Sequence, residues 1–342
     1  DSEIDFIGGQ LNAGGSGIFA SSMTKHMPTL LNLMSDVLLN PTFPESELEK
    51  IKTNTISNLA SEKADPNAIS RNVSNVLKYG ADHPYGYNTE PEHFTALEQH
   101  DLINYYSRNL SLKNAFLVLS GKYDKSIRDE ILTSLDVTLT EKNPYEQKFF
   151  TNTPPYETLK ENTKNDSQVS IKMGRLLFDR QDPDFSKMFF LNTLFGGYFG
   201  SRLMKNIREE KGYTYGIYSS LDAYKQGGIF YISSDVSNNH MDPCIDEIYK
   251  EMDVLKSDLV NAAELDMVRN FILGQSLHLI DGPFATAHLI KNIVVKELEI
   301  KDFEKHINTI KEMSASDVLD TANKYFEKNL FTSVIAGSFV VK

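Results

Sequence analysis

The chain of 342 residues has no tryptophan and a single cysteine, Cys244. One cysteine excludes an internal disulfide and every metal site that needs several thiolates. We expect Cys244 to be a small buried hydrophobic side chain. The sequence also lacks a run of about eighteen apolar residues, so no membrane span is predicted. Its first residues, DSEIDFIGGQ, lack the basic and apolar regions of a signal peptide.

Basic residues are outnumbered, with 35 Lys and Arg against 47 Asp and Glu and a formal net charge of −12. No dense stripe of Lys or Arg offsets this charge, so no nucleic-acid partner is predicted. The composition, 40% hydrophobic and 24% charged, is typical of a globular protein. It leaves the compartment open.

Several catalytic motifs are missing. No two of the eight histidines are four residues apart, which excludes both HExxH and HxxEH. The motif GxSxG does not occur, and GGYFGS (196–201) lacks the Lys-Ser/Thr end of a phosphate-binding loop. We expect its glycines to form a tight turn into the next helix. The sequence therefore predicts no metal site of its own.

What the chain does have is a clear alternation of helical and strand patterns. Helices are predicted at 26–40, 44–63, 66–78, 95–109 and 183–195, and strands at 15–24, 114–121, 167–178, 228–236 and 330–339. Residues 141–166 lose periodicity and gather Pro, Asn and Thr, which is typical of a linker. We predict an α+β fold of two similar domains, 1–140 and 167–342, each a mixed β-sheet with helices packed on it.

The two parts repeat each other in order. Residues 15–24 match the GIF strand near 227–236, 45–56 match 261–272, and 100–121 match 316–337. The first copy has only 18 residues before Phe19, whereas the second has roughly 50–60 more, about a strand, a helix and a turn. We therefore expect the first domain to be truncated at its N-terminus and the chain to be a fragment.

The stretch SRLMKNIREEKGYTYGIYSSL (201–221) places Arg208 and Tyr215 seven residues apart across a corner at Gly212. A solvated Arg and a packed Tyr would explain both residues without any function. However, a guanidinium and a phenol are both hydrogen-bond donors, and peptide cleavage builds negative charge on the scissile carbonyl oxygen. Gly212 permits the sharp corner that would bring them together.

At these residues the chain resembles the pitrilysin/insulinase family of zinc peptidases, which includes the mitochondrial processing peptidases. The family's motif SRL…(I/L)RExxG(L/Y)xY stands here as SRLMKNIREEKGYTY. The stretches IDFIGGQLNA, LLNLMSDVLLNPTFPESELEKIK, DPNAI…YGADHPYG and LVLSGKYD also fit, so the resemblance covers nearly the whole chain in order.

The resemblance implies two halves that close around a peptide, of which one binds zinc through HxxEH and a downstream Glu. The other half supplies an Arg/Tyr pair that contacts the substrate, and Arg208 and Tyr215 would take these roles. Asn58 stands where the family has its third zinc ligand, and Asn is a poor zinc ligand. Glu62, one turn later, is more simply a solvated helix residue.

We therefore expect a non-metal half or subunit of a zinc endopeptidase, active only with a metal-bearing HxxEH half. That partner would hold Zn²⁺, whereas this chain would hold no cofactor and would bind the peptide substrate in an extended form at a sheet edge. One alternative is a self-sufficient zinc peptidase whose HxxEH helix lies in missing N-terminal residues. Another is a non-catalytic scaffold or peptide-binding subunit.

Overall fold

The structure is a computed structural model that describes residues 2–14, 17–110, 115–135, 157–164, 168–224 and 227–339. Its contacts separate two compact units, each described here by itself. The first unit comprises residues 1–55, 92–147 and 281–290, and the second comprises 56–91, 148–280 and 291–342. The helices α3 (Glu45–Glu62) and α11 (Gly282–Val295) each contribute to both units.

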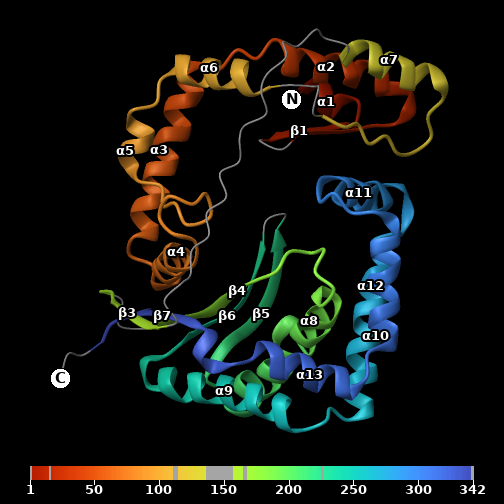
Figure 1. The fold of residues 1–342 in the computed structure, drawn as a ribbon. Helices are drawn as coiled ribbons and strands as arrows, with labels where there is room; N and C mark the ends of the chain where they lie inside the picture. Colours follow the sequence, from red (N-terminus) through yellow and green to blue (C-terminus); the bar gives the residue numbers. More distant parts are fainter. Residues whose placement is uncertain are drawn as a thin grey trace. The chain divides into compact units, whose positions relative to one another are not determined.

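The first unit packs helices on a two-stranded antiparallel sheet (Figure 1). Its other elements are α1 (Ser2–Phe6), β1 (Gln10–Gly14), β2 (Gly17–Ser21), η1 (Thr24–His26), α2 (Met27–Leu39), α5 (Pro91–Thr95), α6 (Gln99–Asn109) and α7 (Lys125–Leu135). Its small core joins Leu31 and Met34 of α2 to Ile131 of α7. The apolar residues of α2 recur at helical spacing, which is why one face of this helix is buried.

The second unit holds most of the core around a mixed five-stranded sheet in the order β3-β7-β4-β6-β5. Its elements are α4 (Pro66–Tyr79), β3 (Thr158–Asn162), β4 (Val169–Leu177), α8 (Phe185–Asn192), η3 (Thr193–Gly197), η4 (Met204–Glu210), β5 (Thr214–Tyr224), β6 (Gly227–Val236), η5 (Asn238–His240), α9 (Met241–Ser257), α10 (Ala262–His278), α12 (Ile300–Glu312), α13 (Ala315–Tyr325), η6 (Lys328–Leu330) and β7 (Thr332–Gly337). Among the strands of this sheet that the structure describes, only the β3–β7 pair is parallel. β5 lies at one end of the strand order and is therefore an edge strand of the described sheet.

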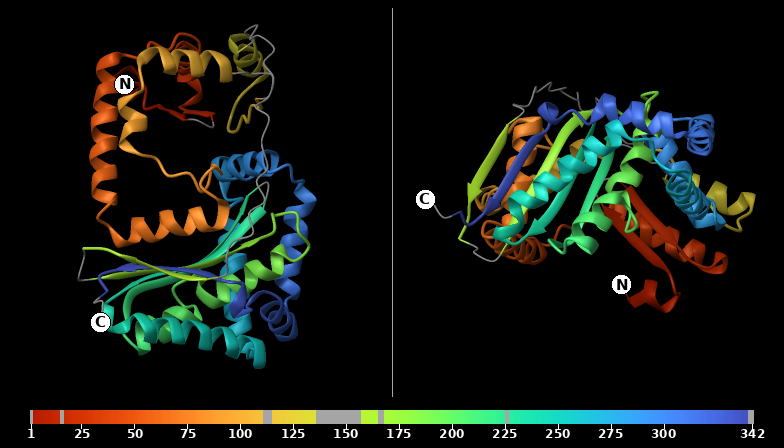
Figure 2. Two further views of the ribbon diagram at one scale, coloured as in Figure 1. Left: turned by 60° about the vertical axis from the view of Figure 1, so that its left-hand side comes forward. Right: turned by 90° about the horizontal axis from the view of Figure 1, so that it is seen from below.

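The two faces of this sheet differ in character. One face carries apolar side chains, such as Ile171 and Phe230, into the large core under α8 and α9. On the other face lies α4, which packs over β4 and β7 through polar contacts (Figure 2). Ser70 of α4 donates a hydrogen bond to Ser170 at 3.0 Å, and Asn67 donates to the Asp235 carboxylate at 2.9 Å.

The predicted α+β class with a mixed sheet and helices is confirmed, and the repeat is visible in detail. In each copy two antiparallel strands lead through a short 3₁₀ turn into a series of five helices. The turns end at His26 and His240, whose backbone angles agree within 3° (φ −106, ψ 0 against φ −103, ψ 2). The aligned residues Asp101 and Asp317 both close capping boxes at helix N-termini.

Two local predictions differ from the structure. Residues 115–121 form no strand, although the repeat aligns them with β7. β7 is held between β3 and β4, whereas the described part of the first unit offers 115–121 no neighbouring strand, and a strand cannot form alone. Conversely, β3 lies inside the predicted linker 141–166. Residues 141–156, most of that linker, lie outside the described residues, and the division into domains 1–140 and 167–342 stays a prediction.

Cys244 is buried as expected, and burial raises the pKa of its thiol to about 12. Among the described residues, no helix combines the length and the apolar character needed to cross a bilayer.

His306 on α12 gives the second unit a pH-dependent contact. Its Nδ1 lies 2.8 Å from Ser186 Oγ, and its ring packs against Phe185 and Phe189. Burial, assisted by the charge of Arg180, lowers the pKa of His306 from 6.5 to about 4. The folded state therefore holds a neutral imidazole.

Because the unfolded chain binds this proton more readily, stability is full above pH 6.5 and is lost as the pH falls toward 4. We expect the free energy of unfolding to drop by about 2 to 3 kcal/mol over this range through His306 alone. His306→Asn, which cannot titrate, should show a correspondingly smaller drop in urea unfolding at the two ends of the range. Equal drops in both proteins would contradict the assignment.

Candidate substrate-contact site

The segment η3 comes just before η4, the helix that carries Arg208, and it packs closely against β5. Gly196 of η3 lies against β5, and a Cβ there would fall 2.6 Å from Ser219 Oγ and 2.7 Å from its backbone nitrogen. Only glycine fits such a contact. Gly200 and Ser201 then turn the chain toward η4, so the predicted turn is confirmed for Gly200, whereas Gly196 and Gly197 of the same GGYFGS stretch lie within η3.

The end of η4 sets the corner. η4 is a π-helical turn, and its last bonds run from Lys211 N–H to Asn206 O at 2.9 Å and from Tyr213 N–H to Ile207 O at 3.0 Å. Such wide turns are frequent at functional sites. Gly212 follows with φ +67°, the left-handed conformation that lets the chain reverse into β5.

β5 begins with a β-bulge. Thr214 pairs with Val236 and Ile217 with Ser234, so Tyr215 and Gly216 together stand opposite one residue of β6. The Thr214 hydroxyl fixes this bulge because it donates to Asp235 O at 2.7 Å and accepts from Gly216 N–H at 3.1 Å. A bulge of this kind redirects the side chain that it contains.

The corner brings Arg208 and Tyr215 together. Arg208 Nε donates to the backbone oxygen of Tyr215 at 2.9 Å, and its guanidinium lies 4.7 Å from the centre of the Phe199 ring. These two contacts fix the guanidinium plane while its terminal nitrogens have no acceptor within the described residues. The Tyr215 side chain is 95% exposed, and within the same described part its hydroxyl has no partner. Both residues therefore present free donors to solvent.

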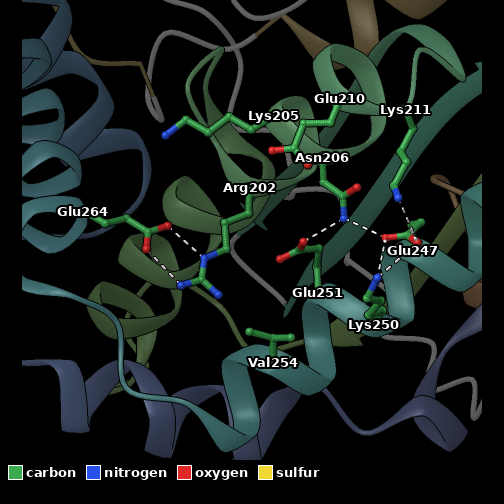
Figure 3. Close-up of a pocket in the computed structure, with 10 residues that line it drawn as sticks. All are labelled: Arg202, Lys205, Asn206, Glu210, Lys211, Glu247, Lys250, Glu251, Val254 and Glu264. Carbon is green, nitrogen blue, oxygen red and sulfur yellow. Dashed lines mark hydrogen bonds and ion pairs between the residues drawn. The ribbon is translucent and has the colours of Figure 1, made fainter.

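Behind the corner lies a charged cleft of about 450 Å³ between η4, α9 and α10 (Figure 3). Contacts across this cleft anchor η4. The Asn206 amide donates to Glu247 and to Glu251, at 2.8 Å each. Arg202 binds both carboxylate oxygens of Glu264, at 2.8 and 2.9 Å. The bond from Asn206, assisted by Lys250, lowers the pKa of Glu247. These contacts fix the buried side of η4. They thereby fix the helix that carries Arg208 on its other side.

The two positions weighed as metal ligands do not form a site. Asn58 is exposed on α3, and Glu62 makes an ion pair with Arg71 at 3.1 Å. The described ranges contain no group of three or more His, Cys, Asp or Glu side chains arranged to hold a metal ion.

Comparison with known proteins identifies the family. Residues 96–272, half of the chain, match the family described as the peptidase M16 inactive domain. The chain belongs to this family. The resemblance to zinc peptidases of the pitrilysin/insulinase type is thereby confirmed at the level of the family.

Relatives of this M16 chain carry both peptidase and non-peptidase names. The "Uncharacterized zinc protease YmxG" of Bacillus subtilis is 24% identical over 77% of this chain, and the match covers 65% of that relative, just under two thirds of its length. The "Non-peptidase homolog YmxG" of Helicobacter pylori is 23% identical over 89% of this chain and 71% of its own. A crystal structure of a peptidase M16 inactive domain from Pseudomonas fluorescens, 19% identical, superimposes with a TM-score of 0.83 over 100% of this chain and 84% of its own.

The sequence singled out Arg208, Tyr215 and Gly212 as candidates, but it did not predict the contacts that hold them in place. Phe199 gave only a weak sequence signal for its contact with Arg208, because an aromatic residue nine positions before an Arg is interpreted as part of the hydrophobic core. The Thr214 bulge and the Asn206 contacts gave no sequence signal.

The left-handed corner generates a prediction about stability. Gly212→Ala should lower the free energy of unfolding by about 1 kcal/mol, because an L-residue is disfavoured at φ +67° although nothing lies within 4 Å of the new Cβ. Gly212→Asn should cost less, since Asn tolerates this conformation. Gly216→Ala is the matched control, as it also has open space but no positive φ. Denaturant unfolding measures all three, and equal costs at 212 and 216 would contradict the argument.

Proposed function

We propose that this chain is the non-metal half of an M16-type zinc endopeptidase and that Arg208 and Tyr215 bind the peptide substrate beside its scissile bond. The observation that carries the proposal is the pair of free donors at the corner. Arg208 is held through Nε and its ring contact, which leaves its terminal nitrogens for a carbonyl oxygen. Tyr215 offers an exposed phenol from the adjoining bulge.

The edge position of β5 supports the same proposal. An extended peptide can pair with an unpaired edge strand, which fixes its backbone and turns alternate side chains to each face. A peptide carbonyl near the bulge would lie within reach of both donors. Their hydrogen bonds would strengthen as negative charge develops on that oxygen, which is how such donors lower a barrier.

The metal would come from the partner half, whose zinc activates water when bound. The two candidate positions in this chain do not suit such an ion: an exposed amide at Asn58 and a carboxylate at Glu62 already paired with Arg71 are poor ligands. The role of this chain is to bind and orient the peptide and, together with the partner half, to close around it.

Mutation of the pair tests the proposal. With the metal-bearing half present, Arg208→Ala and Tyr215→Phe should each lower kcat/KM for peptide cleavage by about ten- to a thousandfold. Arg208→Lys should recover only part of the loss, because an ammonium lacks the planar fork. Lys205→Ala, an exposed cation on the same helix facing the cleft, is the control and should keep wild-type rates. Wild-type rates in all variants would instead favour a non-catalytic scaffold or peptide-binding subunit; the Helicobacter relative is named a non-peptidase homologue.

Zinc content separates this proposal from a self-sufficient enzyme. The chain alone should retain far less than one zinc per molecule after gel filtration, and Asn58→Ala should change nothing. The reconstituted enzyme should hold zinc in proportion to its metal-bearing half. Stoichiometric zinc on this chain, lost in Asn58→Ala or Glu62→Gln, would overturn the assignment as the non-metal half.

A further inference from the structure

The polar face of β5, beyond the bulge, carries a cluster of aromatic and polar side chains. Tyr218, Ser220, Asp222 and Tyr224 alternate along the strand and so share one face. Their partners on β6 share that face as well, and Tyr231 stands directly opposite Ser220. The rings of Tyr218 and Tyr231 meet edge to face, with centroids 6.2 Å apart.

This face is separate from the core. The intervening residue Ser219 turns to the opposite side, where its hydroxyl donates to Asn192 of α8 at 2.8 Å. On the polar side α4 packs over β4 and β7. Tyr218 is 49% exposed and Tyr224 37% exposed.

The end of α4 and the turn that follows it complete the cluster. The Tyr85 ring lies 4.7 Å from that of Tyr224 and 5.5 Å from that of Tyr79, the last residue of α4. His83 stacks on Tyr79 at 5.0 Å and so supports the turn. Aromatic rings from two distant segments thus surround the end of β5, and all of them belong to the second unit.

Asp222 lies among these rings and accepts hydrogen bonds from neighbouring hydroxyl groups. Ser220 donates to its Oδ1 at 2.9 Å, and the Tyr224 hydroxyl lies 3.5 Å from Oδ2. Burial and the charge of Asp222 raise the pKa of Tyr224 to about 12 and also raise that of Tyr231. In the described ranges no Lys or Arg forms an ion pair with Asp222 within 4.0 Å. Lys296 is near enough to interact with its charge but makes no such pair.

We propose that Asp222, together with the rings of Tyr85, Tyr224 and Tyr231, binds the cationic side chain of a Lys or Arg in the peptide. A carboxylate supplies the counter-charge, and tyrosine faces attract an ammonium or guanidinium through their electron-rich rings. The hydroxyls satisfy the remaining hydrogens of the cation. That the peptide is a protease substrate rests on the proposed function, whereas the binding itself does not.

The geometry also sets the position of the basic residue. Asp222 follows Tyr215 by seven residues along the same edge strand, a separation of roughly 20 Å at the rise of a β-strand. A peptide paired with β5 places one side chain beside each residue of the strand. The basic residue should therefore lie about six to seven positions from the residue that meets Tyr215.

Binding of labelled peptides to the full chain, without the metal-bearing half, tests the proposal by fluorescence anisotropy. Peptides of one length and sequence carry Lys, Arg, norleucine or Glu at a single scanned position. We expect Lys and Arg to bind about three- to tenfold more tightly than norleucine at the predicted position only, with Glu weakest. Asp222→Asn should remove the difference between Lys and norleucine, and Tyr224→Leu should reduce it.

Asp246→Asn is the matched control, because it removes an exposed carboxylate of equal charge on α9 and should leave the difference intact. Equal binding of the Lys and norleucine peptides, or no binding of either, would overturn the subsite. An equal effect of Asp222→Asn and Asp246→Asn would also overturn it, since only general charge would then be read. Failure here leaves the effect of Arg208→Ala on cleavage unchanged, so the two proposals can fail separately.

Discussion

The antiparallel pairing of β5 with β6, interrupted at one bulge, is the constraint on which the rest of the second unit depends. The Thr214 hydroxyl closes the bulge on Asp235 O, and the regular register resumes at Ile217. Without the bulge, Tyr215 would follow the regular alternation of side chains between the two faces of the strand. With it, the start of β5 presents Tyr215 beside Arg208, while the rest of the strand keeps one apolar and one polar face.

The two sides of η4 differ in how their polar side chains are used. On the buried side the Asn206 amide nitrogen bridges two glutamates, and Arg202 is paired with Glu264. On the exposed side, Arg208 donates through Nε to the backbone oxygen of Tyr215, and its two terminal nitrogens remain available as donors. A guanidinium held in this way loses little conformational freedom when it binds a carbonyl. The same helix thus gains rigidity from one face and offers contacts from the other.

Helices and the repeat could be predicted from sequence because their signals are local: the apolar period of α2 and the aspartates of the aligned capping boxes lie within a few residues. Residues 115–121 could not, because the same β-rich pattern forms a strand only where neighbours exist, as at β7. Arg208 and Tyr215 were found through a motif within one short stretch. The surroundings of Asp222 depend on strand register and on a turn more than a hundred residues away, which no local pattern encodes.

The segment that matches the M16 family includes some of these residues but not all of them. Residues 96–272 include the Arg208 corner, Asp222 and Tyr231, whereas Tyr85 lies before the matched segment. The corner is thus built within one continuous stretch of the fold, while the aromatic cluster needs a segment that reaches the sheet from the preceding helix. The two proposed roles, contact at the scissile bond and recognition of a distant basic side chain, therefore rest on different parts of the chain. If both hold, changes in the turn after α4 alter the preference for the basic residue without disturbing Arg208 or Tyr215.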